Sequence, residues 1–172
     1  MMTSEIYWIP GLKPGRLAIL GRPRAGDWLE DEIAGWHSAG ITDVVALIED
    51  HEIRDLDLPR EPEIVRRAGI VFERFPIPDR GVPASATSAR SFCDQLAARV
   101  RAGRSVGVHC RAGIGRSALM VVGTLRCLGV PPTEAWERAS RARGVLVPDT
   151  EAQRAWVGDT FREGLKGSAS GD

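Results

Sequence analysis

Segments with two different hydrophobic periods alternate along this chain, and that alternation restricts the folds open to it. Short apolar runs rich in β-branched residues, as at residues 41–48, are typical of buried strands. Longer segments carry apolar residues at helical spacing, as at residues 85–102, where Phe92, Leu96 and Val100 share one face. Strands that alternate with helices predict an α/β fold with a mainly parallel central sheet flanked by helices.

The same patterns predict the order of the elements. Strands are expected at residues 6–9, 17–20, 41–48, 70–77 and 105–109. Helices are expected at residues 28–39, 62–68, 85–102, 116–128, 133–143 and 149–165. Asp149 is interpreted as the N-cap of the last helix. We expect a single domain over residues 1–165 and a flexible, glycine- and serine-rich tail over residues 166–172.

Composition and charge argue against several classes of function. The chain has 23 basic and 23 acidic residues, whereas non-specific nucleic-acid binding relies on an excess of positive charge. The longest apolar stretch, residues 118–122, is too short to cross a bilayer, and the N-terminus lacks the pattern of a signal peptide. Three cysteines without a close pair predict neither a disulfide framework nor a metal site. We therefore expect a cytoplasmic monomer in a reducing compartment, with no nucleic-acid or membrane partner.

The spacing C-x5-R occurs twice, in two different contexts. Cys93 and Arg99 lie within a helical pattern that contains no glycine, so the backbone N–H groups there are used by the helix. We interpret Cys93 as a packing residue. Cys110 and Arg116 lie in GVHCRAGIGRS, between an expected strand and an expected helix.

The stretch around Cys110 combines three features of an anion site. A buried strand delivers Cys110 to the carboxyl end of the sheet, where α/β folds place their ligands. Gly113 and Gly115 permit a tight loop with inward-facing N–H groups, and a helix N-terminus follows near Arg116. The Arg116 guanidinium suits two phosphate oxygens, and the same field favours a nucleophilic thiolate, to which Ser117 can donate a hydrogen bond. The alternative, a glycine turn with an inert cysteine, leaves this combination unexplained.

The stretch HCRAGIGRS resembles the signature loop H-C-x-x-G-x-x-R-[ST] of the cysteine-based protein tyrosine and dual-specificity phosphatases. The resemblance implies the fold of that family and a cysteinyl-phosphate intermediate on Cys110. It implies a phosphorylated protein or another phosphomonoester as substrate, with no metal and no cofactor. It also implies a phosphate-binding loop made of Arg111, Ala112, Gly113, Ile114, Gly115 and Arg116.

A phosphoester also needs a proton for its leaving group, and the resemblance places this general acid on a loop before the cysteine. Asp79, in FPIPDRGVP, takes that role, although by itself it is typical of a P-D-R-G turn. His109 is expected to orient the loop through a hydrogen bond and not to act in catalysis directly, because its side chain alternates away from that of Cys110. Gln153 either resembles a glutamine that positions the hydrolytic water in some family members or is an exposed helix residue.

The class of substrate is less constrained. The family's members that act only on phosphotyrosine carry extra segments and a recognition tyrosine, whereas this chain is short and its single tyrosine is Tyr7. A shallow, dual-specificity-like pocket is therefore expected. Phosphoinositide phosphatases that resemble this loop have two basic residues at variable positions; Arg111 matches one, and Ile114 departs from the other. A phosphoinositide or other small-molecule phosphatase, or a phospho-binding module without turnover, are the alternatives.

Overall fold

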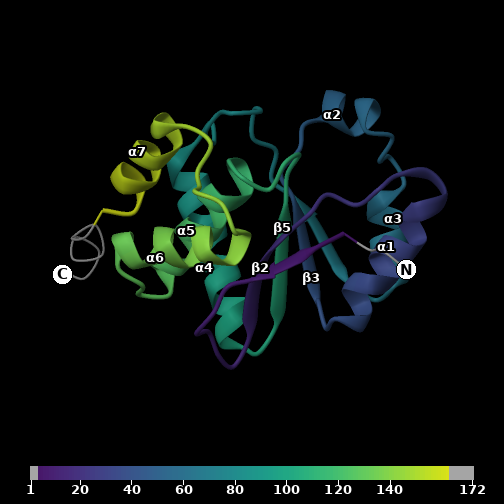
Figure 1. The fold of residues 1–172 in the computed structure, drawn as a ribbon, viewed down its shortest axis with the longest axis horizontal. Helices are drawn as coiled ribbons and strands as arrows, with labels where there is room; N and C mark the ends of the chain where they lie inside the picture. The colour runs from purple at the N-terminus through teal and green to yellow at the C-terminus, as the bar shows by residue number, and fades with distance from the viewer. Residues whose placement is uncertain (1–3, 163–172) are drawn as a thin grey trace.

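A five-stranded sheet forms the centre of the structure, a computed structural model that describes residues 4–162 (Figure 1). The strand order is β1-β2-β5-β3-β4; β1 pairs with β2 in antiparallel fashion, and the other pairings are parallel. The strands are β1 (Ile6–Trp8), β2 (Arg16–Leu20), β3 (Asp43–Ala46), β4 (Val71–Arg74) and β5 (Ser105–His109). The predicted α/β class with a mainly parallel sheet is confirmed.

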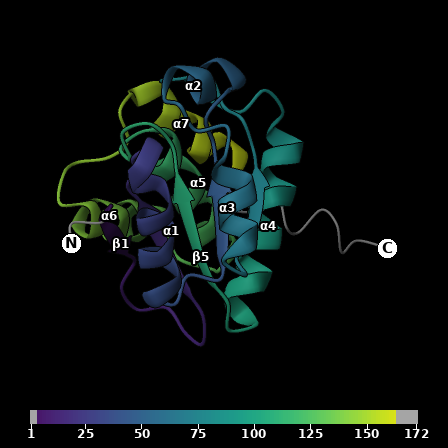
Figure 2. The ribbon, with the colours of Figure 1, turned by 90° about the vertical axis from the view of Figure 1, so that its right-hand side faces the viewer.

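Helices cover both faces of the sheet (Figures 1 and 2). One face carries α1 (Leu29–Ser38), which follows the 3-10 turn Gly26–Trp28, and α3 (Glu61–Arg67). The other face carries α4 (Ala86–Arg101), α5 (Arg116–Cys127), α6 (Pro132–Arg143) and α7 (Glu151–Thr160). The short helix α2 (Asp50–Asp55) follows β3 and lies past the carboxyl ends of the parallel strands. None of the helices within residues 4–162 has both the length and the apolarity to cross a membrane.

The period of two in the strands explains why helices pack on both faces. Leu17 and Ile19 enter the hydrophobic core beneath α4 to α7, whereas Ala18 and Leu20 enter the core beneath α1 and α3. Each fully buried leucine or isoleucine contributes about 1.5–3 kcal/mol of transfer free energy. The helix α5 is buried along almost its whole length, as its apolar sequence predicts, and so becomes the central helix of its layer.

Two strands are shorter than their apolar runs predicted. The run at residues 41–48 ends as a strand at Ala46, and the run at residues 70–77 ends at Arg74. The remaining apolar residues, such as Ile48 and Ile77, are buried in the segments that continue beyond the sheet. These segments lead toward the carboxyl edge of the sheet, where the candidate site lies.

Two helix predictions were incomplete. The helix α2 was not predicted, because DHEIRD has no apolar period; a capping box between Glu49 and Glu52 stabilises its first turn. Asp149 is not the N-cap of the last helix. Thr150 has that position, and its Oγ1 accepts a hydrogen bond from the backbone N–H of Gln153 at 3.1 Å. The predicted end of this helix at residue 165 and the tail at residues 166–172 lie outside the described residues.

Candidate active site

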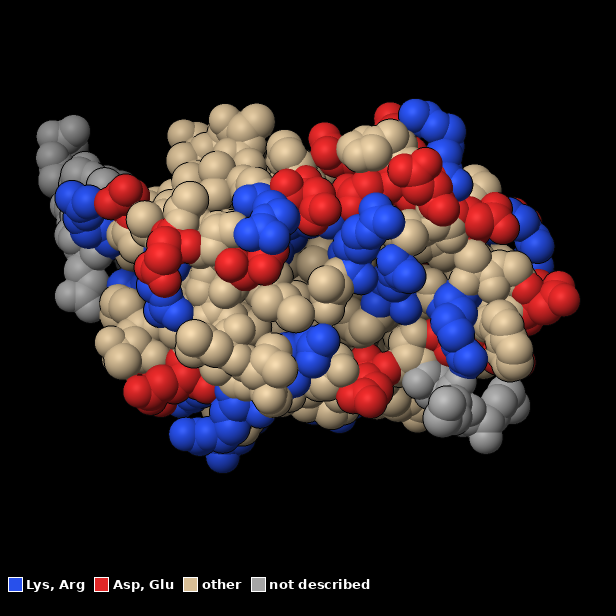
Figure 3. All heavy atoms as spheres, turned by 45° about the horizontal axis from the view of Figure 1, so that its top comes forward, with Lys and Arg blue, Asp and Glu red and all other residues tan. Residues whose placement is uncertain are grey.

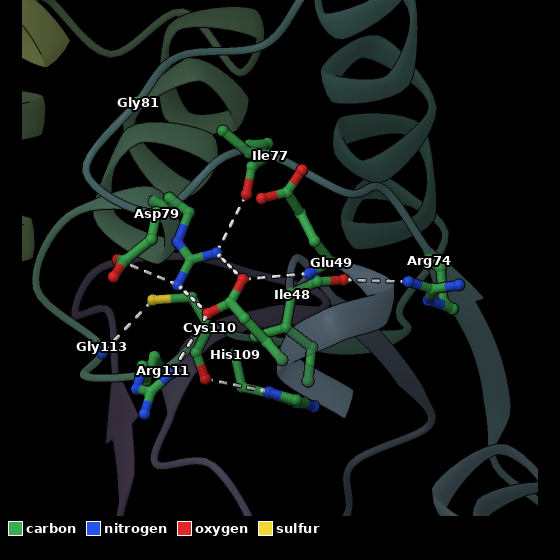
Figure 4. Close-up of polar contacts among 12 residues, drawn as sticks. Ile48, Glu49, Arg74, Ile77, Asp79, Gly81, His109, Cys110, Arg111 and Gly113 are labelled. Carbon is green, nitrogen blue, oxygen red and sulfur yellow. Dashed lines mark hydrogen bonds and ion pairs between the residues drawn. The ribbon is translucent and has the colours of Figure 1, made fainter. Parts of the chain in front are cut away.

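The strand β5 ends at His109, and the next residue, Cys110, opens the loop that leads into α5 (Figure 4). Cys110 is only 3% exposed, and its Sγ accepts a hydrogen bond from the backbone N–H of Gly113 at 3.3 Å. The loop turns back because Gly113 has a φ of +73°, a conformation that side chains with a Cβ rarely adopt. The sulfur therefore faces the concave side of the loop.

Arg143, from α6, supports this loop from its other side. Its Nε donates to the carbonyl of Gly113 at 3.2 Å, and its Nη2 donates to the carbonyl of Ala112 at 3.3 Å. In a planar trans peptide the N–H points opposite to the C=O, so the N–H groups of Gly113 and Ile114 face the concave side. The guanidinium itself lies over the ring of Tyr7 on β1, 4.4 Å from the ring centroid. Backbone donors are thus held ready for an anion.

Arg116 is buried at the start of α5 and contacts three residues on two other segments. Its two terminal nitrogens bind the carboxylate of Glu52 on α2, with Nη1–Oε1 at 2.6 Å and Nη2–Oε2 at 2.8 Å. Nη1 also donates to the carbonyl of Ile77 at 2.9 Å, and Nη2 lies 3.2 Å from Oδ1 of Asp79. A bidentate pair of this kind fixes the plane of the guanidinium.

The electrostatics of this pair keep both partners charged. Burial alone would raise the pKa of Glu52, but the hydrogen bonds and charge of Arg116 outweigh it, so the pKa of Glu52 lies below its ordinary value. Burial alone would lower the pKa of Arg116, yet Glu52 and the nearby Cys110 and Asp79 raise it. At neutral pH the site therefore contains a fixed guanidinium cation.

Asp79 lies on a tight turn beside the cysteine loop. The backbone N–H of Gly81 donates to the carbonyl of Pro78 at 2.8 Å, and Arg80 has a φ of +59°. The Asp79 side chain is 54% exposed, and one of its oxygens contacts Arg116. The structure thus brings Cys110, Arg116 and Asp79 together, as Figure 4 shows for the labelled Cys110 and Asp79.

His109 lies behind the nucleophile in a fully buried position. Its Nδ1 is 3.3 Å from the carbonyl oxygen of Cys110, and its Nε2 is 2.5 Å from Oε1 of Glu61, at the start of α3. Burial alone would lower the pKa of His109, but the charge and hydrogen bond of Glu61 raise it. This arrangement favours an imidazole ring that donates from both nitrogens and so fixes the backbone at Cys110.

The two remaining candidates are both buried. Gln153 is buried, so the interpretation of this residue as an exposed helix residue was wrong. Its Nε2 donates to the carbonyl of Gly81 at 3.0 Å. The Oγ of Ser117 is buried and has no hydrogen-bond partner within residues 4–162. That hydroxyl, two positions into the helix that follows the loop, is therefore available as a donor.

One group of side chains in the described structure could hold a cation. Glu49, His51 and Glu52 place one ligand atom each within 4.8 Å of one another. Both oxygens of Glu52 already bind Arg116, so a cation at this position would compete with the guanidinium. The side chain of Arg111 lies nearby, with Nη1 4.0 Å from Oε2 of Glu52.

Three residues of this arrangement were not expected from the sequence: Glu52, Glu61 and Arg143. The spacing from Glu49 to Glu52 fits a capping box, and Pro62 is typical of a first helical turn, so both helix starts carried a local signal. Neither signal indicates the partners, because Arg116 and His109 lie far along the chain. Arg143 carried no local signal at all.

Comparisons with known proteins agree on one family. Residues 19–129 match the family model described as "Polymorphic toxin system, DSP-PTPase phosphatase". Cyclin-dependent kinase inhibitor 3 of Rattus norvegicus is 30% identical over 130 residues, which are 74% of this chain and 60% of that protein. A tyrosine-protein phosphatase of Autographa californica nuclear polyhedrosis virus is 35% identical over 81 residues, covering 45% of this chain and 48% of the viral protein. The chain thus spans 60% or less of the length of these curated relatives.

Solved structures share the fold over most of the chain. Kinase associated phosphatase superposes with a TM-score of 0.84 at 20% identity, covering 96% of this chain and 99% of the other. Tk-PTP in its active form gives a TM-score of 0.74 at 26% identity, covering 92% and 97%. PTPMT1 in complex with PI(5)P gives 0.67 at 22% identity, covering 90% and 94%.

The matched family model begins in β2 and ends just after α5, so it includes the segments that carry Asp79, Cys110 and Arg116. It covers more than half of the chain, and the fold agrees with it throughout. The chain therefore belongs to the DSP-PTPase phosphatases of polymorphic toxin systems, a family of cysteine-based phosphatases of the tyrosine and dual-specificity type.

Proposed function

We propose that this protein hydrolyses phosphomonoesters through a cysteinyl-phosphate on Cys110, with a phosphorylated protein as its substrate. The observation that carries the proposal is the contact of Arg116 with Asp79, beside the anion-binding loop that holds the sulfur of Cys110. Nucleophile, cation and acid are three groups that phosphoryl transfer requires. Their convergence from two loops far apart in sequence supports a catalytic site.

In the first step, the thiolate of Cys110 attacks the phosphorus atom. The guanidinium of Arg116 and the N–H groups of the loop bind the non-bridging oxygens, where charge develops in the transition state. As the S–P bond forms, the bond from phosphorus to the leaving oxygen breaks, and Asp79 transfers its proton to that oxygen. The products are the free alcohol or phenol and the cysteinyl-phosphate.

In the second step, water attacks the phosphorus atom of this intermediate. The carboxylate of Asp79 accepts the proton of the water, the P–S bond breaks, and inorganic phosphate leaves. Ser117 donates a hydrogen bond to the departing thiolate of Cys110, for which its unpartnered hydroxyl is suited. The Glu52 carboxylate fixes the plane of Arg116 in both steps.

The proposed substrate class is supported by the charge of the loop. Arg111 is partly balanced by Glu52, and Ile114 carries no charge, so the loop offers little extra attraction to a headgroup with several phosphates. On the face seen in Figure 3, a row of acidic side chains lies directly beside a group of basic ones, so their charges partly offset each other. A phosphorylated side chain of a protein fits this surface better than a polyphosphorylated lipid or a nucleic acid.

The proposal extends to the setting of the reaction. A thiolate nucleophile must stay reduced, so we place the protein in a reducing compartment such as the cytoplasm. The chain contributes every side chain of the site by itself, which supports action as a monomer. The family description suggests that the phosphatase itself acts within a polymorphic toxin system.

The test is hydrolysis of an aryl phosphate, with vanadate as a phosphate mimic that should inhibit it. Turnover should disappear in Cys110→Ser, because an alcohol at this position is not ionised at neutral pH. It should persist in Cys93→Ser, the matched control in the other C-x5-R segment. Turnover that survives Cys110→Ser, or that vanadate does not inhibit, contradicts the proposal.

Substrate class is tested by comparing rates on phosphotyrosine, phosphoserine and phosphothreonine peptides with rates on phosphoinositides. Phosphoinositides belong in the comparison because PTPMT1, with the same fold, has been solved with PI(5)P. A phosphoinositide that is hydrolysed faster than every peptide would replace the protein substrate. Tight binding of a phosphopeptide without turnover would instead make the chain a phospho-binding module.

A further inference from the structure

Gln153 is a polar residue in a fully buried position, and the amide of its side chain is bonded on both sides. The side-chain Oε1 accepts from the backbone N–H of Thr150 at 3.1 Å, while the backbone N–H of Gln153 donates to Oγ1 of Thr150 at 3.1 Å. This reciprocal capping box fixes the side chain against the start of α7. The Nε2 group is then directed away from the helix and donates to Gly81.

Gly81 closes the turn that carries Asp79, so the bond from Gln153 acts on the acid loop directly. The contact joins residues that are 72 positions apart. At the other end of the same turn, the carbonyl of Ile77 accepts from Arg116. Figure 4 shows Asp79 on the segment between Ile77 and Gly81, and this segment is therefore anchored on both sides of the acid.

The two anchors differ in what happens when a phosphate binds. Arg116 is itself one of the groups that bind the phosphate oxygens, and its contact with Asp79 then competes with the substrate. The bond from Gln153 to Gly81 involves no group that binds phosphate. It can persist throughout the reaction and hold the acid loop while Arg116 is engaged.

The same side chain also lies against the phosphate-binding loop. A Cβ on Gly115 would be 3.0 Å from Nε2 and 3.1 Å from Oε1 of Gln153, so a larger residue there would crowd the amide. Gly115 directly precedes Arg116. One buried amide thus packs on the loop of the nucleophile and bonds the loop of the acid.

We propose that Gln153 is a positioning residue that fixes the Asp79 loop over the phosphate-binding loop, so that the acid is in place when the leaving group departs. This inference rests on the proposed phosphatase reaction. It assigns Gln153 to the position of Asp79, and therefore to formation of the cysteinyl-phosphate, in which Asp79 is the acid. A glutamine that only orients the hydrolytic water would act in the second step alone.

The two steps respond differently to the leaving group, and this difference provides the test. The value of kcat/KM reports the steps through formation of the cysteinyl-phosphate, where a poor leaving group depends most on its acid. In Gln153→Leu, kcat/KM for an alkyl phosphate should fall on the order of tenfold, as expected for a misplaced general acid. The nitrophenolate of p-nitrophenyl phosphate leaves readily without a proton, so kcat/KM for this substrate should fall by less than about twofold. The decline of kcat/KM on the alkaline side should also weaken for the alkyl substrate.

A control and a second variant separate positioning from folding. Arg154 follows Gln153 on α7; it donates to the carbonyl of Val147 at 3.0 Å and lies 4.7 Å from the centroid of the Trp136 ring. Arg154→Ala should lower the melting temperature and leave the leaving-group dependence unchanged. In Gln153→Glu, a carboxylate oxygen can still accept from the backbone N–H of Thr150. The carboxyl group can donate to the carbonyl of Gly81 only when it is protonated. Relative to the parent protein, the activity of this variant on the alkyl phosphate should therefore recover as the pH falls.

Three results would overturn the inference. Equal losses on both substrates would indicate a general structural effect. A burst of nitrophenol followed by slow turnover, with kcat/KM for the alkyl phosphate unchanged, would place Gln153 in hydrolysis of the intermediate alone. Unchanged kinetics would remove Gln153 from the reaction. Failure of the proposed function is a separate outcome, because it would appear as a parent protein without vanadate-sensitive turnover.

Discussion

The two C-x5-R segments have the same spacing, but one lies within a helix and the other forms the loop between a strand and a helix. In α4, Cys93 is fully buried, and its Sγ makes a long donor contact with the carbonyl of Met120 at 3.7 Å; burial raises its pKa far above the usual value of a thiol. Arg99 points elsewhere and pairs with Asp43 and Glu73. A helix advances about 1.5 Å per residue, so it separates two residues at this spacing by roughly 9 Å.

In the second segment the backbone folds back on itself, and the same spacing makes a site. The sulfur of Cys110 receives the N–H of Gly113, and Arg116 turns its guanidinium toward the loop that carries Asp79. The difference lies in the glycines and in the strand before them. A pair of reactive residue types therefore indicates chemistry only when the backbone between them can form a loop with free N–H groups.

The largest expected difference between the two segments concerns their arginines. Arg116→Lys should lower kcat/KM by about 10²- to 10³-fold, because a lysine cannot bind two phosphate oxygens and Glu52 at the same time. Arg99→Lys should leave kcat/KM within about twofold of the parent value, since a partly exposed ion pair contributes little. Steady-state rates on one aryl phosphate measure both. A comparable loss in the two variants would mean that the C-x5-R context does not decide function.

The carboxylates that pair with the two arginines give the next difference. Glu52→Gln should cost about 3 kcal/mol of the free energy of unfolding, because it leaves the Arg116 charge buried with an incomplete set of partners. Glu73→Gln, which alters the partly exposed pair with Arg99, should cost less than about 1 kcal/mol. Urea denaturation at neutral pH measures both values. Equal costs would show that the Glu52–Arg116 pair is not a buried structural pair.

The pH dependence of this effect has a defined sign. The pKa of Glu52 is lowered in the folded protein, so its stabilisation is fully present above the ordinary carboxyl value of 4.5 and is lost as the pH falls through the folded pKa. The difference in the free energy of unfolding between the parent and Glu52→Gln should therefore shrink in acid. A difference that stays constant from pH 7 down to the acid transition would contradict the assigned cause.

The loop around Cys110 was recognisable in the sequence because its residues are contiguous. A strand, two glycines, an arginine and a helix follow one another, so local patterns are enough to suggest the site. The identification of Asp79 required one further inference: the leaving group needs a proton, and the family resemblance places the acid on a loop that follows another strand. The fold class followed from the alternation of hydrophobic periods for the same reason, since each period is a local property.

The supporting residues were not recognisable because their roles depend on partners brought together by the fold. Glu52 and Glu61 lie in polar stretches that are typical of a solvated surface, yet both are buried by contacts with Arg116 and His109. A carboxylate can be buried only when it is paired, and no local pattern reveals a partner that far along the chain. Gln153 was a candidate through the family resemblance alone, and its burial depends on contacts with Thr150 and Gly81 that the fold provides.

The smallest expected difference concerns the residues that follow the two arginines, Ser117 and Val100. Both are buried, but Ser117 carries a hydroxyl that has no partner in the described part of the chain. If that hydroxyl served stability, Ser117→Ala would destabilise the protein. Because it makes no hydrogen bond, we expect the free energy of unfolding to stay the same or to rise by up to about 1 kcal/mol.

The effect of Ser117→Ala should instead appear in one kinetic step. A hydrogen bond to the departing thiolate acts when the cysteinyl-phosphate breaks down, so kcat should fall roughly tenfold, the worth of one hydrogen bond to a charged group. The value of kcat/KM, which reports formation of the intermediate, should stay unchanged. Rapid mixing with p-nitrophenyl phosphate should then reveal a burst of nitrophenol, which the parent protein lacks if its second step is fast. A fall in kcat/KM without a burst would instead assign Ser117 to the first step, alongside Arg116 and Asp79.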